Sequence, residues 1–169
     1  PGKPNAYGLI GGRRNAIEPE KRMLSSMTPT LIFKEDGSII ATGSPGGSRI
    51  INIVLQMTCN LADHGMNVAE ATAAPRFHHQ WFPDEIRIER GFSPDTIRLL
   101  ASRGHKVRLG PALGSTQTIS YGAGIFQGAS DPRRRGALTI GLPPFPEEGV
   151  PKPAAKTPQD EDGKRAKSK

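Results

Sequence analysis

Residues 30–63 decide the fold, and they read TLIFKEDGSIIATGSPGGSRIINIVLQMTCNLAD. Two apolar runs, Thr30–Phe33 and Ser38–Thr42, flank an Asp-Gly pair, which favours a β-hairpin with a type I′ turn because that turn needs positive φ at both central positions. After a loop rich in Gly and Ser, apolar side chains recur every three or four positions across Arg49–Asp63, the spacing of an amphipathic helix. The stretch therefore predicts a hairpin, a tight loop and a helix that ends near Gly65.

The apolar patterns that follow add two helices and four strands. A capping box formed by Asn67 and Glu70 starts a short helix that Pro75 stops, and a second helix is predicted over Ser93–Arg103. Strands are predicted at Asp84–Glu89, Lys106–Leu109, Ser115–Tyr121 and Gly124–Gln127. Consecutive hairpins of this kind predict a layered α/β (α+β) fold, in which helices pack on an antiparallel sheet.

The composition of the 169-residue chain changes abruptly near its end. Residues 147–169 hold many Pro, Lys, Asp and Glu but one large apolar side chain, Val150. Such a segment cannot bury enough apolar area to offset the entropy lost on ordering. We therefore expect a folded unit over 1–141 and a disordered tail over 142–169. At the other end, residues 1–17 are rich in Gly and Asn and predict a lid-like loop.

Composition also argues against several function classes. The net charge of +7 is scattered, and no aromatic side chain lies in the basic run Arg133–Arg135, so nucleic acid is not an expected partner. One cysteine excludes an internal disulfide framework, and no Cys, His or Asp spacing resembles a zinc site, so neither a metal nor another cofactor is expected. No apolar run is long enough to span a bilayer and no signal peptide is visible, so the residues do not reveal the compartment.

The loop between the predicted hairpin and helix is the strongest candidate site. Gly46 and Gly47 allow a sharp turn that brings backbone N–H groups close to a ligand, and a helix start leaves N–H groups unpaired at a partly positive end. Such a junction can hold an anion, either a phosphate or a transient oxyanion. A tight connection with Ser48 as the helix cap is the alternative. The loop lacks the Lys of a P-loop, and no G-x-S-x-G nucleophile elbow occurs.

A second candidate is the pair Ser25-Ser26, just before the first strand. Neighbouring hydroxyls can donate hydrogen bonds to a carboxylate without carrying charge themselves, although Ser-Ser is also a common turn element. Serine nucleophilic catalysis would need an aligned base and an orienting acid. Nothing in the spacing brings any of the four histidines near these serines.

Several segments together resemble the gamma-glutamyltranspeptidase family. They are Pro4–Gly12, Lys21–Pro29, Thr42–Arg49, Ala69–Gln80, Gly91–Thr96 and Gly128–Arg133. The most specific sequences are GSPGGSRI at 43–50 and NVAEATAAPRFHHQW at 67–81. The resemblance covers nearly all of 1–141 in the family's order. It implies part of the four-layer αββα sandwich of the N-terminal-nucleophile hydrolases, which two subunits cut from one precursor build together.

The resemblance also implies roles for individual residues. Ser25 and Ser26 match the serines that hydrogen-bond the α-carboxylate of the gamma-glutamyl group, and Gly46 and Gly47 match the glycines whose amides form the oxyanion hole. Tyr7 matches the aromatic residue of a lid loop over the pocket. The family's nucleophile is a threonine at the N-terminus of the small subunit, where this chain has Pro1. We therefore expect the chain to be the C-terminal part of the small subunit, without the nucleophile and inactive alone.

The implied activity is gamma-glutamyl transfer or hydrolysis on glutathione and related gamma-glutamyl compounds, with water, an amino acid or a peptide as acceptor. The implied partners are the large subunit and the N-terminal part of the small subunit, at a periplasmic or secreted location. Two alternatives stay open. The chain could come from a relative that acts on poly-gamma-glutamate or cephalosporin side chains, or it could be a non-catalytic module that kept the fold.

Overall fold

The computed structural model describes residues 2–142. Pro1 and residues 143–169 lie outside the described residues, and so does almost all of the segment predicted to be a disordered tail. The chain divides into a compact unit over Pro1–Thr139 and a second unit, Ile140–Lys169, of which residues 140–142 are described. Among the described residues, the first unit carries all the elements of regular structure and both candidate sites.

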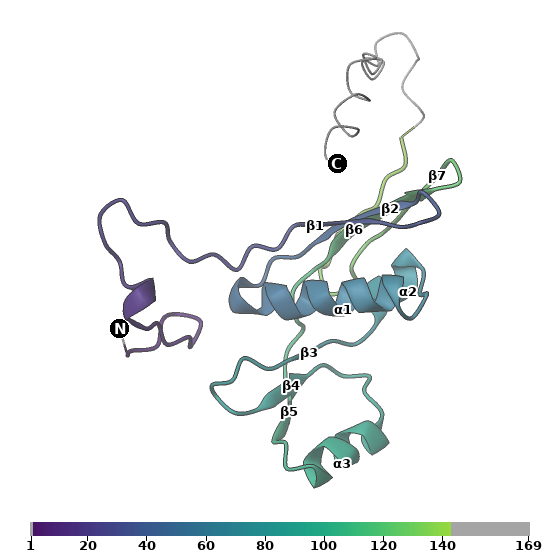
Figure 1. Ribbon diagram of the computed structural model, residues 1–169. Coiled ribbons are helices and arrows are strands. Elements are labelled where there is room, and N and C mark those ends of the chain that lie inside the picture. Colours follow the sequence, from purple (N-terminus) through teal and green to yellow (C-terminus); the bar gives the residue numbers. More distant parts are fainter. Residues whose placement is uncertain (1, 143–169) are drawn as a thin grey trace, which may run out of the picture. The chain divides into compact units, whose positions relative to one another are not determined.

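A four-stranded antiparallel sheet forms one layer of this unit (Figure 1). Its order is β1-β2-β6-β7, with β1 at Thr30–Phe33, β2 at Ile39–Gly43, β6 at Gln117–Gly122 and β7 at Ile125–Ala129. The predicted hairpin β1–β2 is confirmed, but its turn type was wrong. The Gly37 N–H donates to Lys34 O, and among the residues of this turn only Gly37 has a positive φ, of 79°. This is a three-residue hairpin loop with a left-handed glycine in place of a type I′ turn.

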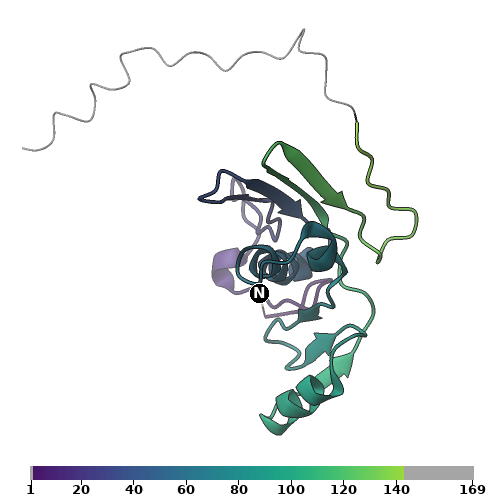
Figure 2. The ribbon, with the colours of Figure 1, turned by 90° about the vertical axis from the view of Figure 1, so that its right-hand side faces the viewer.

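Two helices cover one face of this sheet. The helix α1 (Ile50–Ala62) follows a short 3₁₀ turn, η2 (Gly47–Arg49), and α2 (Val68–Ala73) begins at the predicted capping box. Their apolar sides pack on the sheet in a core made of Ile40, Met57, Leu61, Val68 and Ala71. Figure 2 looks along α1 and shows it beneath the sheet.

A second sheet was not predicted as a separate unit. It has the order β3-β4-β5, with β3 at Phe77–His78, β4 at Ile86–Ile88 and β5 at Val107–Leu109. The strands β4 and β5 are parallel, because the helix α3 (Pro94–Ser102) connects them as a crossover. The helix α1 contacts β2 of the first sheet and β3 of the second, so it lies between the two. One more 3₁₀ turn, η1 (Arg13–Asn15), lies in the N-terminal loop.

The face of the first sheet that points away from α1 is apolar and exposed. Strand register places Leu31, Ala41 and Ile119 in one row across the sheet, and Phe33, Ile39, Tyr121 and Phe126 in the next. The Phe33 and Phe126 side chains are 71% and 74% exposed. Contiguous exposed apolar surface of this kind marks an interaction face.

Candidate active site

The glycine loop lies between β2 and α1, where the sequence predicted it. Gly46 has φ 148° and Gly47 has φ 58°, conformations that side chains with a Cβ rarely adopt. Within residues 2–142, neither amide N–H donates to a hydrogen-bond acceptor. Gly46 is the N-cap of η2 and Gly47 is its first residue, so both amides lie at the partly positive end of the helix that continues as α1. The loop can therefore present two free donors to negative charge.

The alternative role of Ser48 as a helix cap was wrong. Neither η2 nor α1 has a side-chain cap hydrogen bond. The Ser48 hydroxyl instead donates to Gln80 Oε1 over 3.0 Å. The glycine loop is thus hydrogen-bonded to a residue 32 positions further along the chain. This bond holds the start of the helix next to the segment that follows β3.

The N-terminal loop brings Tyr7 onto the glycine loop. A Cβ on Gly47 would collide with a ring carbon of Tyr7, so the ring lies directly against this glycine. The loop is a narrow turn closed by Asn5, whose Oδ1 accepts from the N–H groups of Tyr7 at 2.9 Å and Leu9 at 3.0 Å. The expected lid-like loop therefore has a defined shape, which the side chain of Asn5 stabilises.

A cavity of about 530 Å³ opens beside Gly46, beneath this loop. Tyr7, Ser48, Arg49, His78, Gln80, Glu85 and Arg87 are among the residues that line it. Arg87 pairs with Glu85 at 2.8 Å, whereas Arg49 forms no ion pair within residues 2–142. Burial lowers the pKa of His78, which keeps its imidazole neutral near pH 7. The cavity wall therefore combines hydrogen-bond donors with an excess of positive charge.

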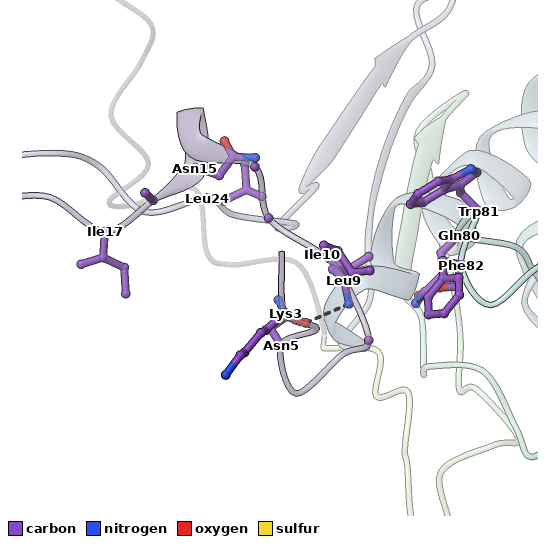
Figure 3. Close-up of a pocket in the computed structure, with 14 residues that line it drawn as sticks. Lys3, Asn5, Leu9, Ile10, Asn15, Ile17, Leu24, Gln80, Trp81 and Phe82 are labelled. Carbon is purple, nitrogen blue, oxygen red and sulfur yellow. Dashed lines mark hydrogen bonds between the residues drawn. The ribbon is translucent and has the colours of Figure 1, made fainter. Parts of the chain in front are cut away.

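The other side of the N-terminal loop faces a larger, more apolar cavity of about 720 Å³. Figure 3 places Leu9 and Ile10 on one side of this cavity and Trp81 and Phe82 on the other. The Trp81 side chain is 74% exposed. Gln80 lines both cavities, so it lies at the boundary between them.

The two serines are not placed beside the glycine loop. Ser25 is exposed and its Oγ accepts from the Met27 N–H at 3.2 Å, as in a local turn. Ser26 is partly buried, and its carbonyl accepts from the Thr28 hydroxyl. Neither serine lines either cavity. Of the residues singled out from the sequence, the structure brings together Tyr7, Gly46 and Gly47.

Sequence reasoning missed Asn5 and Gln80 as residues that organise the site. An Asn at the start of a Gly-containing loop is a signal for a side-chain-closed turn, so Asn5 could have been found. Gln80 could not, because two of its partners, Ser48 and Tyr7, are 32 and 73 positions away in the sequence. Among residues 2–142, no group of His, Cys, Asp and Glu side chains could hold a metal ion, and no described helix is long and apolar enough to cross a membrane.

Comparison with known proteins identifies relatives of the chain. The chain is 61% identical over 142 residues to the glutathione hydrolase proenzyme of Escherichia coli (strain K12), a match that covers 83% of this chain and 24% of the relative. It spans about a quarter of the length of this relative and of two glutathione hydrolase proenzymes from Pseudomonas.

Solved structures extend the likeness to the fold. A Helicobacter pylori gamma-glutamyltranspeptidase superimposes with a TM-score of 0.75 at 47% identity, over 79% of this chain and 75% of that one. A Pseudomonas nitroreducens gamma-glutamyltranspeptidase gives 0.75 at 35% identity, over 84% and 76%. The layered α+β fold of this N-terminal-nucleophile hydrolase family is thus confirmed. The family model of gamma-glutamyltranspeptidase matches residues 1–141, and the chain belongs to this family.

Proposed function

We propose that residues 1–141 are the C-terminal part of the small subunit of an enzyme that transfers gamma-glutamyl groups. The observation that carries the proposal is the pair of free amides at Gly46 and Gly47, held at a helix start beneath Tyr7. When a nucleophile attacks the gamma-glutamyl amide, its carbonyl oxygen becomes an oxyanion. Two preorganised N–H donors beside that oxygen stabilise the transition state more than the substrate.

The donor would be glutathione or a related gamma-glutamyl compound, and water, an amino acid or a peptide would accept the acyl group. The Escherichia coli relative is a glutathione hydrolase proenzyme, which supports this choice over poly-gamma-glutamate or cephalosporin side chains. Ser25 and Ser26 would bind the α-carboxylate of the gamma-glutamyl group. Because neither serine lines the cavity beside Gly46, this role requires segment 21–29 to pack differently when the rest of the enzyme is present.

The rest of the enzyme would be the large subunit and the N-terminal part of the small subunit, which carries the threonine nucleophile. The exposed apolar face of the four-stranded sheet supports this proposal, since a second sheet packed on it would bury Leu31, Phe33, Ile119 and Phe126. That packing would complete the αββα sandwich. A protein of this kind would act in the periplasm or outside the cell, where other members of the family are commonly found.

Replacing Gly46 by valine in the complete enzyme tests the proposal. A β-branched side chain cannot adopt φ 148° without moving the loop, and loss of an oxyanion donor lowers kcat by about 100- to 1000-fold. Release of the anilide from a gamma-glutamyl anilide measures the rate. Gly124→Val is the matched control, because Gly124 also has positive φ but lies in the β6–β7 turn with open space around it. Unchanged turnover in Gly46→Val would contradict the proposal.

Residues 1–141 on their own should release no anilide, because the threonine is expected to lie outside them. Activity in the isolated chain would overturn the assignment of the nucleophile to another segment. A complete protein that binds but does not turn over gamma-glutamyl compounds would instead support the non-catalytic alternative.

A further inference from the structure

Gln80 makes four hydrogen bonds that join three separate segments at the edge of the proposed site. Its Nε2 donates to the carbonyl oxygens of Tyr7, at 3.0 Å, and Phe82, at 3.1 Å. Its Oε1 accepts from the Ser48 hydroxyl at 3.0 Å and from His78 Nε2 at 2.9 Å. A carboxamide offers two donors and two lone pairs. The hydrogen-bonding capacity of Gln80 is therefore filled.

The orientation of this carboxamide follows from its partners. Two backbone carbonyls can only accept, so the NH₂ group must face Tyr7 and Phe82, and the oxygen must face Ser48 and His78. His78 must then carry its proton on Nε2. Burial lowers the pKa of His78 and favours the neutral ring, while its Nδ1 is buried without a partner among residues 2–142. A neutral Nε2–H tautomer satisfies the network.

Two of these bonds reach the lid loop and the glycine loop at the same place. Tyr7 is held through its carbonyl by Gln80, while its ring lies against Gly47. Ser48, the next residue after Gly47, is held by the oxygen of the same carboxamide. We propose that Gln80 is a positioning residue that clamps the Tyr7 lid onto the Gly46-Gly47 loop, so that the aim of the two amides depends on the lid being closed.

This inference rests on the proposed function and adds a coupling to it. When the lid is closed, one carboxamide holds both sides of the contact between Tyr7 and Gly47. When the lid lifts, Gln80 loses an acceptor and the tyrosine ring leaves the glycine. The loop then keeps its bond to Gln80 through Ser48 but loses the packing that restrains Gly47. A small displacement of a reacting group or donor is enough to slow a reaction strongly.

Gln80→Glu in the complete enzyme removes the two bonds that Nε2 donates and keeps the two that Oε1 accepts. The carboxylate keeps acceptors for Ser48 and His78 but places an oxygen opposite the carbonyls of Tyr7 and Phe82, which releases the lid. Gln56→Glu is the matched control. The Gln56 carboxamide is also half-buried and makes three hydrogen bonds, donating to the carbonyls of Asn52 at 2.8 Å and Phe77 at 2.9 Å and accepting from Phe77 N at 3.0 Å, but none reaches the lid.

We expect Q80E to lower kcat about 10- to 100-fold and to speed tryptic cleavage at Arg13 and Arg14, which follow the lid. Q56E should change neither. In a Tyr7→Ala background, Q80E should reduce kcat by less than about twofold further, since coupled residues are not additive. Should Q80E not assemble, Gln80→Met removes the same donors without adding charge.

The outcomes separate this inference from the proposed function. The clamp is overturned if Gly46→Val abolishes turnover but Q80E matches Q56E in kcat and in cleavage rate, or if the effects of Q80E and Tyr7→Ala simply add. The proposed function itself fails if Gly46→Val turns over normally. The cleavage assay reports on the lid in either case, because it requires no activity.

Discussion

Replacing Asp131 by asparagine should destabilise the protein more than the replacement of any exposed charged residue. The Asp131 carboxylate is fully buried and accepts from Arg76 Nη2 at 2.8 Å and from the N–H of Thr116 at 2.7 Å. Its other oxygen accepts from the N–H of Arg133 at 2.9 Å. Arg133 in turn pairs with Glu89, which closes a buried network of two cations and two anions. Asp131→Asn keeps the shape but leaves this network with one uncompensated positive charge.

The magnitude follows from that charge. Removing one partner of a buried ion pair costs about 3–5 kcal/mol, because the other charge stays buried without compensation. For a folding unit of about 150–250 residues, each 1 kcal/mol lowers the melting temperature by about 2–4 °C. The loss should therefore be about 6–20 °C. Calorimetry of the complete protein at pH 7 measures this fall in melting temperature.

Asp95→Asn is the control for this measurement. Asp95 also pairs with an arginine, Arg98, but the two side chains are 73% and 78% exposed. An exposed pair is weakened by solvent, so the variant should melt within about 2 °C of the parent protein. If Asp131→Asn also melts within about 2 °C of the parent, the buried network does not stabilise the fold and the reasoning is refuted.

The same carboxylate gives the prediction a pH dependence. Burial alone would raise the pKa of Asp131, but the N–H groups of Arg133 and Thr116 and the guanidinium of Arg76 outweigh it and lower the pKa from 3.8 to about 2. Because the folded pKa lies below the unfolded value, the stabilisation is present above pH 3.8 and is lost as the pH falls through about 2. The shift corresponds to about 2 kcal/mol. Asp131→Asn should lack this part of the acid destabilisation.

Two further substitutions test packing around the site. Gly114→Ala should lower the free energy of unfolding by about 3 kcal/mol, because a Cβ there would meet Ile53 Cδ1 and Ser44 Oγ, both at 2.5 Å, at a φ of 66°. Gly124 has a similar φ but open space around it, so Gly124→Ala should cost only about 1 kcal/mol. Urea unfolding measures both variants. Phe33→Asp should leave α1 and its core intact but prevent assembly with the proposed second sheet, because it places a charge on the exposed apolar face. When this chain is co-expressed with the rest of the enzyme, size-exclusion chromatography should then show the chain eluting alone.

Local signals in the sequence predicted most of the elements. The capping box of Asn67 and Glu70 forms as expected, with hydrogen bonds of 3.0 and 2.9 Å, and the helix at 93–103 starts at Ser93 with Pro94 in its first turn. These features depend on residues within four positions of one another, so they are visible in the chain itself. The position of the glycine loop between β2 and α1 follows from the same kind of local signal.

Non-local contacts account for what the sequence did not predict. The parallel pairing of β4 with β5 depends on how α3 packs back on the sheet, although the order strand, helix, strand already permits a crossover. The strand β3 has two residues, too few to show alternation. The partners Arg76 and Asp131 are 55 positions apart, and Gln80 and Tyr7 are 73 apart. No periodicity or motif spacing connects residues at such distances.

The missed strand β3 is also what makes the clamp at Gln80 rigid. Two features fix the chain just before this strand: the N–H of Arg76 donates to Glu89 at 2.8 Å, and the Arg76 side chain enters the buried network. Gln80 follows within four residues, too short a length of chain to drift far from these anchors. The buried ion network and the proposed lid clamp are therefore two ends of one segment, and weakening the network should loosen the lid before it unfolds the sheet.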